Sequence, residues 1–290
     1  MKVGIIGAGA IAGTMAGTIR EMDCAQNYAV AARDYGRAAE FAQTYGFEKA
    51  YGSYEELVED AGVELVYIAT PHSHHYEHIK LCLNHGKHVL CEKSFTVNES
   101  QAREVLALAR EKKLLLTEAI WTRYMPMRKT LDSVLSSGII GRPYMLTANL
   151  GYIISGKERI MRPELAGGAL LDVGIYPLNF ASMVFGDEVD SITGTAVMTE
   201  TGVDAQNSIT ITYKDGKMAA LCSSAMGLSD RRGIIYGDNG FIEVENINNC
   251  EGIRVYDRSR NMIASYDTPK QISGYEYEVE ACLRAIKEGA

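Results

Sequence analysis

A glycine-rich segment near the N-terminus has the residue types and spacing of a loop that binds a dinucleotide. It reads Gly7-Ala8-Gly9-Ala10-Ile11-Ala12, after an apolar run that predicts a strand and before a pattern that predicts a helix. In such a loop the first glycine forms a tight turn, the second lets the backbone approach a pyrophosphate, and the third small residue lets the helix pack on the strand. The alternative, a glycine-rich turn without a ligand, is disfavoured by this strand–loop–helix order. The residues expected to bind the dinucleotide are Gly7, Gly9, Ala10, Ile11 and Ala12.

The residues after the second predicted strand indicate which dinucleotide the loop prefers. An acidic side chain at this place accepts hydrogen bonds from the ribose 2′-OH of NAD, whereas an arginine accommodates the 2′-phosphate of NADP. The strand is expected over Tyr28–Ala32, and Arg33 and Asp34 follow it. A guanidinium pairs with a phosphate and stacks on adenine, so Arg33 favours NADP. The alternative is that Arg33 is a solvated loop charge and that Asp34 binds the ribose of NAD.

All six histidines fall in one short stretch, which makes a zinc site an obvious hypothesis. They are His72, His74, His75, His78, His85 and His88. Structural zinc is held by cysteine, histidine and carboxylate ligands at short, regular spacings, and no cysteine or carboxylate stands at such a spacing here. We therefore expect no metal, and we expect several of these histidines to be ordinary residues on a helix face.

The first half of the chain alternates short apolar runs with helical patterns. This alternation predicts a parallel, doubly wound sheet, and the apolar character of the strands agrees with burial on both faces. The predicted strands are Lys2–Gly7, Tyr28–Ala32, Leu65–Ala69, His88–Cys91 and Leu114–Glu118, and the predicted helices are Ile11–Met22, Arg37–Tyr45, Tyr54–Asp60, His75–Asn84 and Glu99–Glu111. We expect residues 1–119 to form an α/β dinucleotide-binding domain of the Rossmann type.

The second half has a different pattern, with several short strands joined by turn signals such as Lys214-Asp215-Gly216-Lys217. The predicted strands are Pro143–Tyr152, Ser191–Thr199, Asn207–Tyr213, Met218–Ser223, Gly233–Tyr236, Gly240–Asn246 and Ile253–Tyr256. A helix over Tyr176–Phe185 is expected to lie in front of this sheet. Residues 120–290 are thus predicted to form an α+β domain with an open, mainly antiparallel sheet that binds the substrate and joins subunits.

Composition argues against several classes of function. The chain of 290 residues has a net charge of −8, whereas a nucleic-acid partner requires a basic surface. We find no uninterrupted apolar run long enough to span a bilayer. Glycines interrupt Met1–Gly7, so we do not expect a signal peptide there. Six scattered cysteines without a Cys-x-x-Cys pair indicate free thiols in a reducing compartment. These patterns predict a cytoplasmic protein with a small-molecule substrate and no membrane partner.

Four segments together resemble the Gfo/Idh/MocA oxidoreductases, the family of glucose–fructose oxidoreductase and inositol dehydrogenase. They are Gly7–Ala12, Tyr67–His75, Glu92-Lys93 and Gly167–Pro177, and they span more than half of the chain. The stretch Thr117–Tyr124 and the Asp-x-Gly-x-Tyr-Pro pattern at Asp172–Pro177 resemble the branch that contains dihydrodiol dehydrogenases and NADP-dependent xylose dehydrogenases. There are two departures from the usual family pattern: Ser94 replaces the proline of Glu-Lys-Pro, and Tyr176 stands where many members have histidine.

The resemblance implies a set of cofactor contacts, an oligomeric state and a substrate class. The residues that it places at the cofactor are Thr70, Pro71, His72, His75, Glu92 and Lys93. It implies a homodimer or homotetramer that associates through the C-terminal sheet, where we expect exposed apolar residues such as Ile209, Ile211 and Val255. It also implies a sugar, polyol or cyclic diol as substrate. Family members commonly continue with another helical segment, so the native chain is expected to extend beyond Ala290.

Within this resemblance, Lys93, Asp172 and Tyr176 are the predicted catalytic residues. Tyrosine has a pKa near 10 and is a poor base at neutral pH, but a nearby ammonium such as that of Lys93 stabilises the phenolate. Asp172 lies four residues before Tyr176 at a helix entry, so both side chains can reach one site; Asp172 would bind a substrate hydroxyl or orient the pair. Trp121 is expected either to wall the substrate pocket beside Arg123 or to anchor the core at the domain junction.

Two other functions remain open at this stage. A non-catalytic sensor of NADP(H) would keep the glycine loop but would not need Lys93, Asp172 and Tyr176 together. A reductase of another substrate class, acting on an imine or a tetrapyrrole, would keep the catalytic residues. The presence of all three favours an enzyme that transfers a hydride between a nicotinamide and a CH–OH carbon, with NADP as its cofactor and NAD as the alternative.

Overall fold

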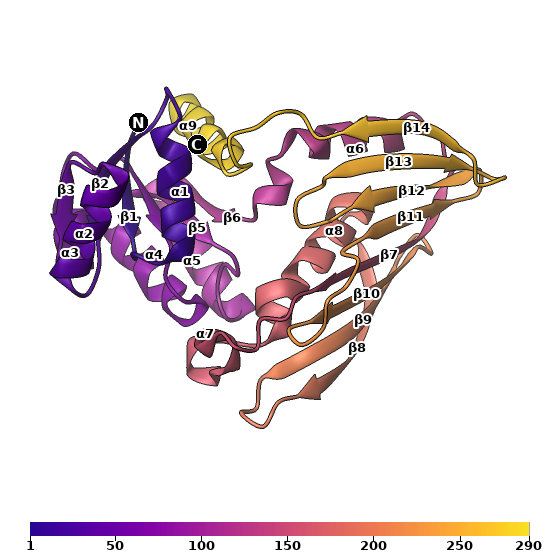
Figure 1. The fold of residues 1–290 in the computed structure, drawn as a ribbon, viewed down its shortest axis with the longest axis horizontal. Helices are drawn as coiled ribbons and strands as arrows, with labels where there is room; N and C mark the ends of the chain where they lie inside the picture. Colours follow the sequence, from indigo (N-terminus) through magenta and orange to yellow (C-terminus); the bar gives the residue numbers. More distant parts are fainter. Residues whose placement is uncertain (290) are drawn as a thin grey trace. The chain divides into compact units, whose positions relative to one another are not determined.

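Two compact units make up the chain, and each has a sheet of its own (Figure 1). The computed structural model describes residues 1–289. The first unit contains Met1–Trp121 and the segment that begins at Gln271, and the second unit contains Thr122–Lys270. The predicted division differs from this in two respects: the boundary lies two residues later than residue 119, and the last segment belongs to the first unit. Ala290, the end of the predicted second domain, lies outside the described residues.

Parallel strands form the sheet of the first unit, in the order β3-β2-β1-β4-β5-β6. They are β1 (Lys2–Ile6), β2 (Gln26–Ala31), β3 (Lys49–Tyr51), β4 (Leu65–Ile68), β5 (His88–Glu92) and β6 (Leu116–Ala119). The order reverses between β1 and β4, and in such sheets ligands bind beyond the carboxyl ends of the strands at this place. The predicted doubly wound sheet is confirmed. Only β3 was not predicted, because a strand of three residues at a sheet edge is too short to show a period.

Helices cover the strands of the first unit and begin at side-chain caps in three cases. They are α1 (Ala10–Arg20), α2 (Tyr35–Tyr45), α3 (Tyr54–Glu59), α4 (His75–Asn84), α5 (Glu99–Lys112) and α9 (Glu276–Glu288). Asp34, Ser53 and Asn98 each accept a hydrogen bond from a backbone N–H of the first turn, at α2, α3 and α5. These caps explain why the predicted helix starts agree with the observed ones to within two residues.

The C-terminal helix α9 lies beside α1 in the first unit (Figure 1). Val279 and Cys282 on α9 are buried in the same apolar cluster as Met15, Ala16 and Ile19 on α1. Burying an apolar side chain of this size stabilises a fold by about 1.5–3 kcal/mol. This packing is the reason why the last segment belongs to the first unit and not, as predicted, to the second.

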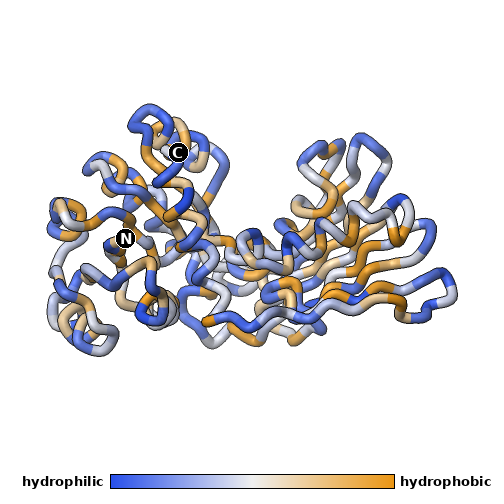
Figure 2. Tube along the Cα trace, turned by 90° about the horizontal axis from the view of Figure 1, so that it is seen from above, coloured by the Kyte–Doolittle hydropathy of each residue, from blue (hydrophilic) through white to orange (hydrophobic). Residues whose placement is uncertain are grey.

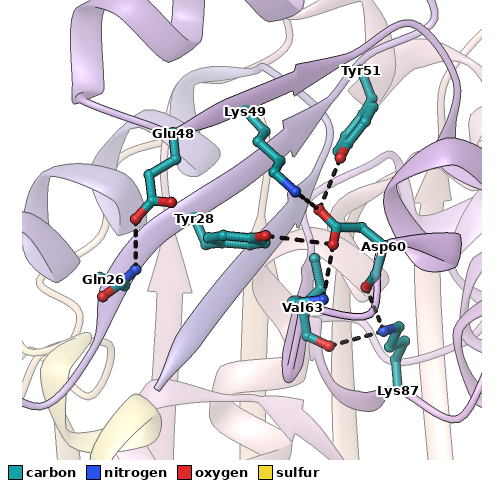
Figure 3. Close-up of polar contacts among 9 residues, drawn as sticks. Gln26, Tyr28, Glu48, Lys49, Tyr51, Asp60, Val63 and Lys87 are labelled. Carbon is teal, nitrogen blue, oxygen red and sulfur yellow. Dashed lines mark hydrogen bonds and ion pairs between the residues drawn. The ribbon is translucent and has the colours of Figure 1, made fainter.

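The carboxylate of Asp60 joins several loops of the first unit (Figure 3). Lys49 Nζ and Tyr51 Oη each donate to Asp60 Oδ2 at 2.8 Å, and the Gly62 amide donates to Oδ1 at 2.8 Å. Partial burial alone would raise the pKa of Asp60, but these hydrogen bonds outweigh it and hold the pKa well below its usual range. Lys87 Nζ donates to the carbonyls of Asp60 and Val63 at 2.7 and 2.9 Å. The network therefore ties the end of α3 to β3 and to the turn before β5.

The second unit has a mixed sheet, in the order β14-β13-β12-β11-β7-β10-β9-β8. Its strands are β7 (Pro143–Gly151), β8 (Val189–Met198), β9 (Asp204–Tyr213), β10 (Met218–Ser224), β11 (Gly233–Gly237), β12 (Gly240–Glu245), β13 (Gly252–Asp257) and β14 (Met262–Asp267). All neighbouring strands are antiparallel except β7 and β10, which pair in parallel. The mainly antiparallel sheet is thus confirmed, and β14 and the helix α6 (Pro126–Ser136) are additions to the predicted elements.

One face of this sheet is buried and the other is exposed, and the prediction assigned some residues to the wrong face. Ile211 and Val255 are 5% and 0% exposed, because they point to the face on which the helix α8 (Ile175–Phe185) packs. The outer face instead exposes Met145 and the paired Met218, at 41% and 43%. Hydrophobic residues recur along these strands between hydrophilic loops (Figure 2). Association of subunits through this face stays a prediction, which the mass of the protein in solution would check.

One helical stretch meets the length and composition of a membrane span, although Glu164 and Asp172 interrupt its apolar residues, so it is not an uninterrupted apolar run. Pro163–Phe185 is long and apolar enough by length and composition alone. However, 61% of its most apolar window is buried inside the protein. A helix that is apolar on all sides is also typical of the core of a large domain. The high hydropathy of this stretch is therefore explained by its packing on β7 and β10.

Candidate active site

The glycine loop has the backbone conformation that a pyrophosphate-binding loop requires. Gly7 has a φ of +105°, and a Cβ atom there would lie 2.9 Å from the carbonyl oxygen of Ala69. Gly9 is the N-cap of α1, it caps the helix without a side chain, and a Cβ atom there would meet open space. Ala12 is fully buried and packs α1 against the sheet. The free N–H groups of the α1 N-terminus thus face an open cradle, which fits a dinucleotide pyrophosphate.

Two arginines and an aspartate lie at the carboxyl end of β2. Arg33 is exposed two residues after the end of β2, where its side chain can reach a ribose phosphate, and this contact stays a prediction. Asp34 Oδ1 accepts the Arg37 N–H at 2.8 Å, so this carboxylate is engaged as the N-cap of α2. Arg37 Nη2 donates to the Ala8 carbonyl at 3.3 Å, which places a second guanidinium against the glycine loop. Arg37 was not predicted from the sequence, although its place in the first turn of the helix after Arg33 could have indicated it.

The segment after β4 carries the residues predicted to lie beside the nicotinamide. Thr70 and Pro71 form the loop, His72 begins a short 3-10 helix, and His75 begins α4. His75 is fully buried, and its Nδ1 and Nε2 each lie 2.8 Å from a backbone carbonyl oxygen, of Ser94 and Thr70 respectively. Burial lowers the pKa of His75, an effect partly offset by these carbonyls. His75 therefore joins the loops that follow β4 and β5.

The histidines do not gather into a metal site. Within residues 1–289, no group of three or more histidine, cysteine or carboxylate side chains could hold a metal ion. His78 Nδ1 lies 3.0 Å from Thr70 Oγ1, and burial lowers its pKa to about 4. His85 Nδ1 is bonded to the Leu81 carbonyl in its own helix. The described histidines thus have structural partners of their own.

Glu92 and Lys93 end β5, and their side chains have different surroundings. The Glu92 carboxylate is buried, accepts a hydrogen bond from the Tyr67 hydroxyl, and accepts the Lys93 N–H at 3.2 Å. Burial raises the pKa of Glu92 to about 7, although the Tyr67 hydrogen bond opposes this. The peptide bond between Lys93 and Ser94 is cis. Glu92 therefore supports the turn that carries Lys93, and a direct contact of its side chain with a cofactor stays a prediction.

A second buried carboxyl lies close to Glu92 and comes from the C-terminal helix. Glu278 on α9 is 0% exposed, and neither of its oxygens has a hydrogen-bond partner among the described residues. Burial, and then the charge of Glu92, raise the pKa of Glu278 well above its ordinary value. Glu278 was not singled out in the sequence, because one glutamate on an amphipathic helix gives no signal of burial.

Replacing Glu278 by glutamine is expected to make the stability of the protein less dependent on pH. A carboxyl whose pKa is higher in the folded than in the unfolded state favours folding only while it is protonated. The free energy of unfolding therefore falls as the pH rises above the unfolded value of about 4.3, by at most about 1.4 kcal/mol per pH unit. Thermal melts between about pH 5 and pH 8 measure this slope. The stability of the Glu278→Gln variant relative to the wild type should rise with pH.

The matched control for this experiment is Glu280→Gln on the same helix. The Glu280 side chain is 45% exposed and lies 3.9 Å from Arg284, so its replacement should leave the slope unchanged. Part of the wild-type slope comes from Glu92, which also has a raised pKa. Parallel slopes for the Glu278→Gln variant and the wild type would show that Glu278 does not titrate as proposed.

In the second unit, Asp172 and Tyr176 lie one helical turn apart. A π-helical segment, Leu170–Gly174, carries Asp172 and leads directly into α8, whose second residue is Tyr176. The two residues are 5% and 9% exposed. Arg159 Nη1, from the short helix α7 (Glu158–Met161), lies 2.8 Å from Asp172 Oδ1. The predicted pair is therefore buried on one helix, and the structure adds a cation that the sequence analysis missed.

Trp121 and Arg123 have partners that fit structural roles. Trp121 is 9% exposed and stacks on Tyr275, with ring centroids 4.5 Å apart. Arg123 Nε donates to Asn179 Oδ1 at 2.6 Å, and its Nη2 donates to Ser182 Oγ at 2.9 Å. Arg123 thus braces α8, the helix that carries Tyr176. Of the two expectations for Trp121, the stacking agrees with a core anchor, and the substrate contacts of both residues stay predictions.

Comparison with known proteins shows which family has this architecture. A family model described as an oxidoreductase family with an NAD-binding Rossmann fold matches residues 1–120. A model of the GFO/IDH/MocA C-terminal domain matches residues 129–243. The two matches agree with the two kinds of sheet described above. Solved structures confirm the fold: a 3-ketoreductase from Actinomadura kijaniata has a TM-score of 0.89 at 24% identity, covering 100% of this chain and 90% of that one.

Curated relatives cover between 79% and 100% of this chain. The trans-1,2-dihydrobenzene-1,2-diol dehydrogenase of Xenopus tropicalis is 34% identical over 99% of this chain and 90% of its own length. The human protein of the same name is 36% identical, over 100% of this chain and 89% of its own length. The Sus scrofa protein is 42% identical over 79% of this chain and 70% of its own length. The chain therefore belongs to the Gfo/Idh/MocA family of oxidoreductases.

Proposed function

We propose that this protein is an NADP-dependent dehydrogenase or reductase that transfers a hydride between the nicotinamide and a hydroxyl or carbonyl carbon of a sugar, polyol or cyclic diol. The observation that carries the proposal is that one chain contains both an open glycine cradle in its first unit and a buried Asp172–Tyr176 pair in its second. The names of the relatives agree with it, since dihydrodiol dehydrogenases act on a cyclic diol. Two solved relatives in fold are described as a 3-ketoreductase and a UDP-N-acetylglucosamine 3-dehydrogenase.

The residues of this chain have separate roles in the proposed mechanism. The nicotinamide, when bound, supplies or accepts the hydride. Gly7 and Gly9 hold its pyrophosphate through backbone N–H groups. Tyr176 exchanges a proton with the substrate oxygen, and Lys93 stabilises the phenolate that this requires. The Asp172 carboxylate accepts a hydrogen bond from a substrate hydroxyl and so orients the reacting carbon.

A substrate panel tests the reaction class directly. Purified protein is mixed with sugars, polyols and cyclic trans-diols, each with NADP or with NAD, and reduced nicotinamide is followed by absorbance at about 340 nm. Turnover of at least one CH–OH substrate with NADP is expected. Tight binding of NADP without turnover of any alcohol, ketone or imine in the panel would instead indicate a sensor. Turnover of imines alone would assign the chain to another reductase class.

Replacing Arg33 by alanine is expected to weaken NADP binding without weakening NAD binding. The loss of a charged hydrogen bond to the 2′-phosphate costs about 1.5–3 kcal/mol, which is roughly a 10- to 150-fold increase in the Kd. Arg37 contacts the glycine loop and contributes to the same phosphate site, so Arg33→Ala combined with Arg37→Ala should weaken NADP binding further. Fluorescence titration of both cofactors measures these Kd values.

The matched control is Arg20→Ala, which removes an exposed arginine in the last turn of α1, away from the loop. This variant should keep the wild-type Kd for both cofactors. An unchanged Kd for NADP in the Arg33→Ala variant, or a wild-type preference for NAD, would contradict the assignment of NADP.

A further inference from the structure

The Asp172 carboxylate has a counter-ion that the proposed mechanism does not yet use. Its side chain is 6% exposed, and the side chain of Arg159, whose Nη1 lies 2.8 Å away, is 40% exposed. A carboxylate buried without a cation or hydrogen-bond donors is strongly disfavoured and takes up a proton instead. The position of Arg159 therefore affects whether Asp172 can be an anionic hydrogen-bond acceptor.

A glycine pair explains how Arg159 reaches Asp172, which is 13 residues later in the chain. A Cβ atom on Gly167 would lie 2.4 Å from the Ile160 carbonyl oxygen and 2.7 Å from that of Arg159. Gly168 has a φ of +104°, and its N–H donates to the Ile160 carbonyl at 2.8 Å. Only glycine at position 167 allows this approach of the two backbones. The Gly167-Gly168 pair thus lets α7 pack closely against the turn that precedes Asp172.

The sheet fixes the other side of the same turn. Asp204 Oδ2 accepts the Leu170 N–H at 2.8 Å and a hydrogen bond from Asn207 Nδ2 at 2.8 Å. Asn207 Oδ1 in turn accepts a hydrogen bond from Ser223 Oγ at 2.9 Å. The π-helical segment therefore begins at a fixed point on β9 and β10, so its backbone is anchored to the sheet while the Asp172 carboxylate pairs with Arg159. An ion pair whose carboxylate lies on a segment fixed by such hydrogen bonds differs from an incidental ion pair on the surface.

A neighbouring arginine shows what an incidental pair looks like in this loop. Arg162 lies 2.7 Å from Glu158 and 3.5 Å from Glu164, and the three side chains are at least 50% exposed. Exposed pairs of this kind contribute little to stability because water screens both charges. Arg159, in contrast, is paired with a buried carboxylate. Arg162 is thus a natural control for Arg159.

We propose that Arg159 is a positioning residue that holds Asp172 ionised and in one orientation, so that the carboxylate selects substrates with a hydroxyl next to the reacting carbon. This inference rests on the proposed function of the Asp172–Tyr176 pair. Tyr176 contacts the reacting oxygen and Asp172 accepts the neighbouring hydroxyl, which are two points of contact one helical turn apart. Arg159 acts through Asp172 and does not take part in proton transfer.

The test compares Arg159→Met, Arg159→Lys and the control Arg162→Met on a vicinal diol and on its analogue that lacks the second hydroxyl. Arg159→Met should lower kcat/KM for the diol about 10- to 100-fold, as expected when a charged hydrogen-bond partner is lost. The kcat/KM for the analogue should fall much less, so the ratio of the two kcat/KM values, which measures the preference for the diol, should decrease. The acid limb of the kcat/KM profile should move to higher pH, because the carboxyl ionises less readily without its cation. Arg159→Lys keeps the positive charge, so each of these changes should be smaller than in Arg159→Met.

Three further measurements separate positioning from a merely structural role. The Kd for NADP should be unchanged in all three variants. The double variant Arg159→Met with Asp172→Asn should be no slower than Asp172→Asn alone, because Arg159 acts through that carboxylate. In melts between about pH 5 and pH 8, Arg159→Met should lose stability with rising pH relative to Arg162→Met. Equal specificity, pH profile and melting slope for Arg159→Met and Arg162→Met would overturn the inference.

The melting comparison also separates this inference from the proposed function. A wild-type protein that oxidises and reduces nothing in the panel would refute the proposed function. The relative melting slopes of Arg159→Met and Arg162→Met would still decide whether Arg159 holds the buried carboxyl ionised. Active wild-type protein with indistinguishable variants would refute the role of Arg159 alone.

Discussion

Replacing Tyr176 by phenylalanine is expected to lower turnover by roughly 100- to 10,000-fold, which is the usual contribution of a positioned acid or base. Tyr176 is only 9% exposed and is the second residue of α8, which packs on the sheet. Phenylalanine at this position therefore keeps the apolar contacts of the ring. Only the hydroxyl is lost, which in the proposed mechanism is the group that exchanges a proton with the substrate oxygen. The Kd for NADP and the melting temperature should remain close to those of the wild type. Steady-state kinetics with the best substrate of the panel measure the effect.

A tyrosine on the outer face of the same unit is the matched control. The Tyr236 hydroxyl lies 3.3 Å from Thr147 Oγ1, on the face of the sheet opposite to α8. Tyr236→Phe should leave turnover unchanged. If the Tyr176→Phe variant kept near-wild-type turnover but melted at a lower temperature, the Tyr176 hydroxyl would be a structural hydrogen-bond donor, and the proposed mechanism would be wrong.

The second large effect is expected for Lys93→Met. Lys93 is the first residue after β5. It therefore lies at the edge of the parallel sheet where ligands bind, beyond the carboxyl ends of the strands. In the proposed mechanism the Lys93 ammonium stabilises the Tyr176 phenolate, so its removal should lower turnover by roughly 100-fold or more. The limb of the pH–rate profile that reports this phenol should move to higher pH. Lys93→Arg keeps the positive charge and should retain part of the activity.

The control for Lys93→Met is Lys112→Met, which removes an exposed lysine in the last turn of α5. It should have wild-type kinetics. A Lys93→Met variant that lost only affinity for NADP, with an unchanged kcat and pH profile, would show that Lys93 is a cofactor ligand and does not tune Tyr176. Folding of each variant is checked by thermal melts, so that a loss of structure is not read as a loss of chemistry.

Local patterns in the sequence determined the nucleotide-binding half of this protein. Gly7-Ala8-Gly9 between an apolar strand and a helix permits the positive φ and the close backbone approach that a dinucleotide-binding loop needs, and the observed loop has the expected form. Alternating apolar runs and helical periods predicted the doubly wound sheet, because both signals depend on neighbouring residues alone. The spacing between Asp172 and Tyr176 likewise predicted that they lie one helical turn apart, and the structure places them on consecutive helical segments, where both are buried.

Only the tertiary structure decided which residues meet across the chain. Arg159 pairs with Asp172, and Glu278 lies beside Glu92. Both contacts depend on how loops and the last helix pack against distant parts of the chain, which no local sequence period encodes. The inward orientation of Ile211 and Val255 had the same cause. Alternation along a strand shows that one face is apolar, but the position of α8 determines which residues are covered. The sequence thus identified the candidate site residues, whereas their buried partners became apparent only from the packing of helices and sheets.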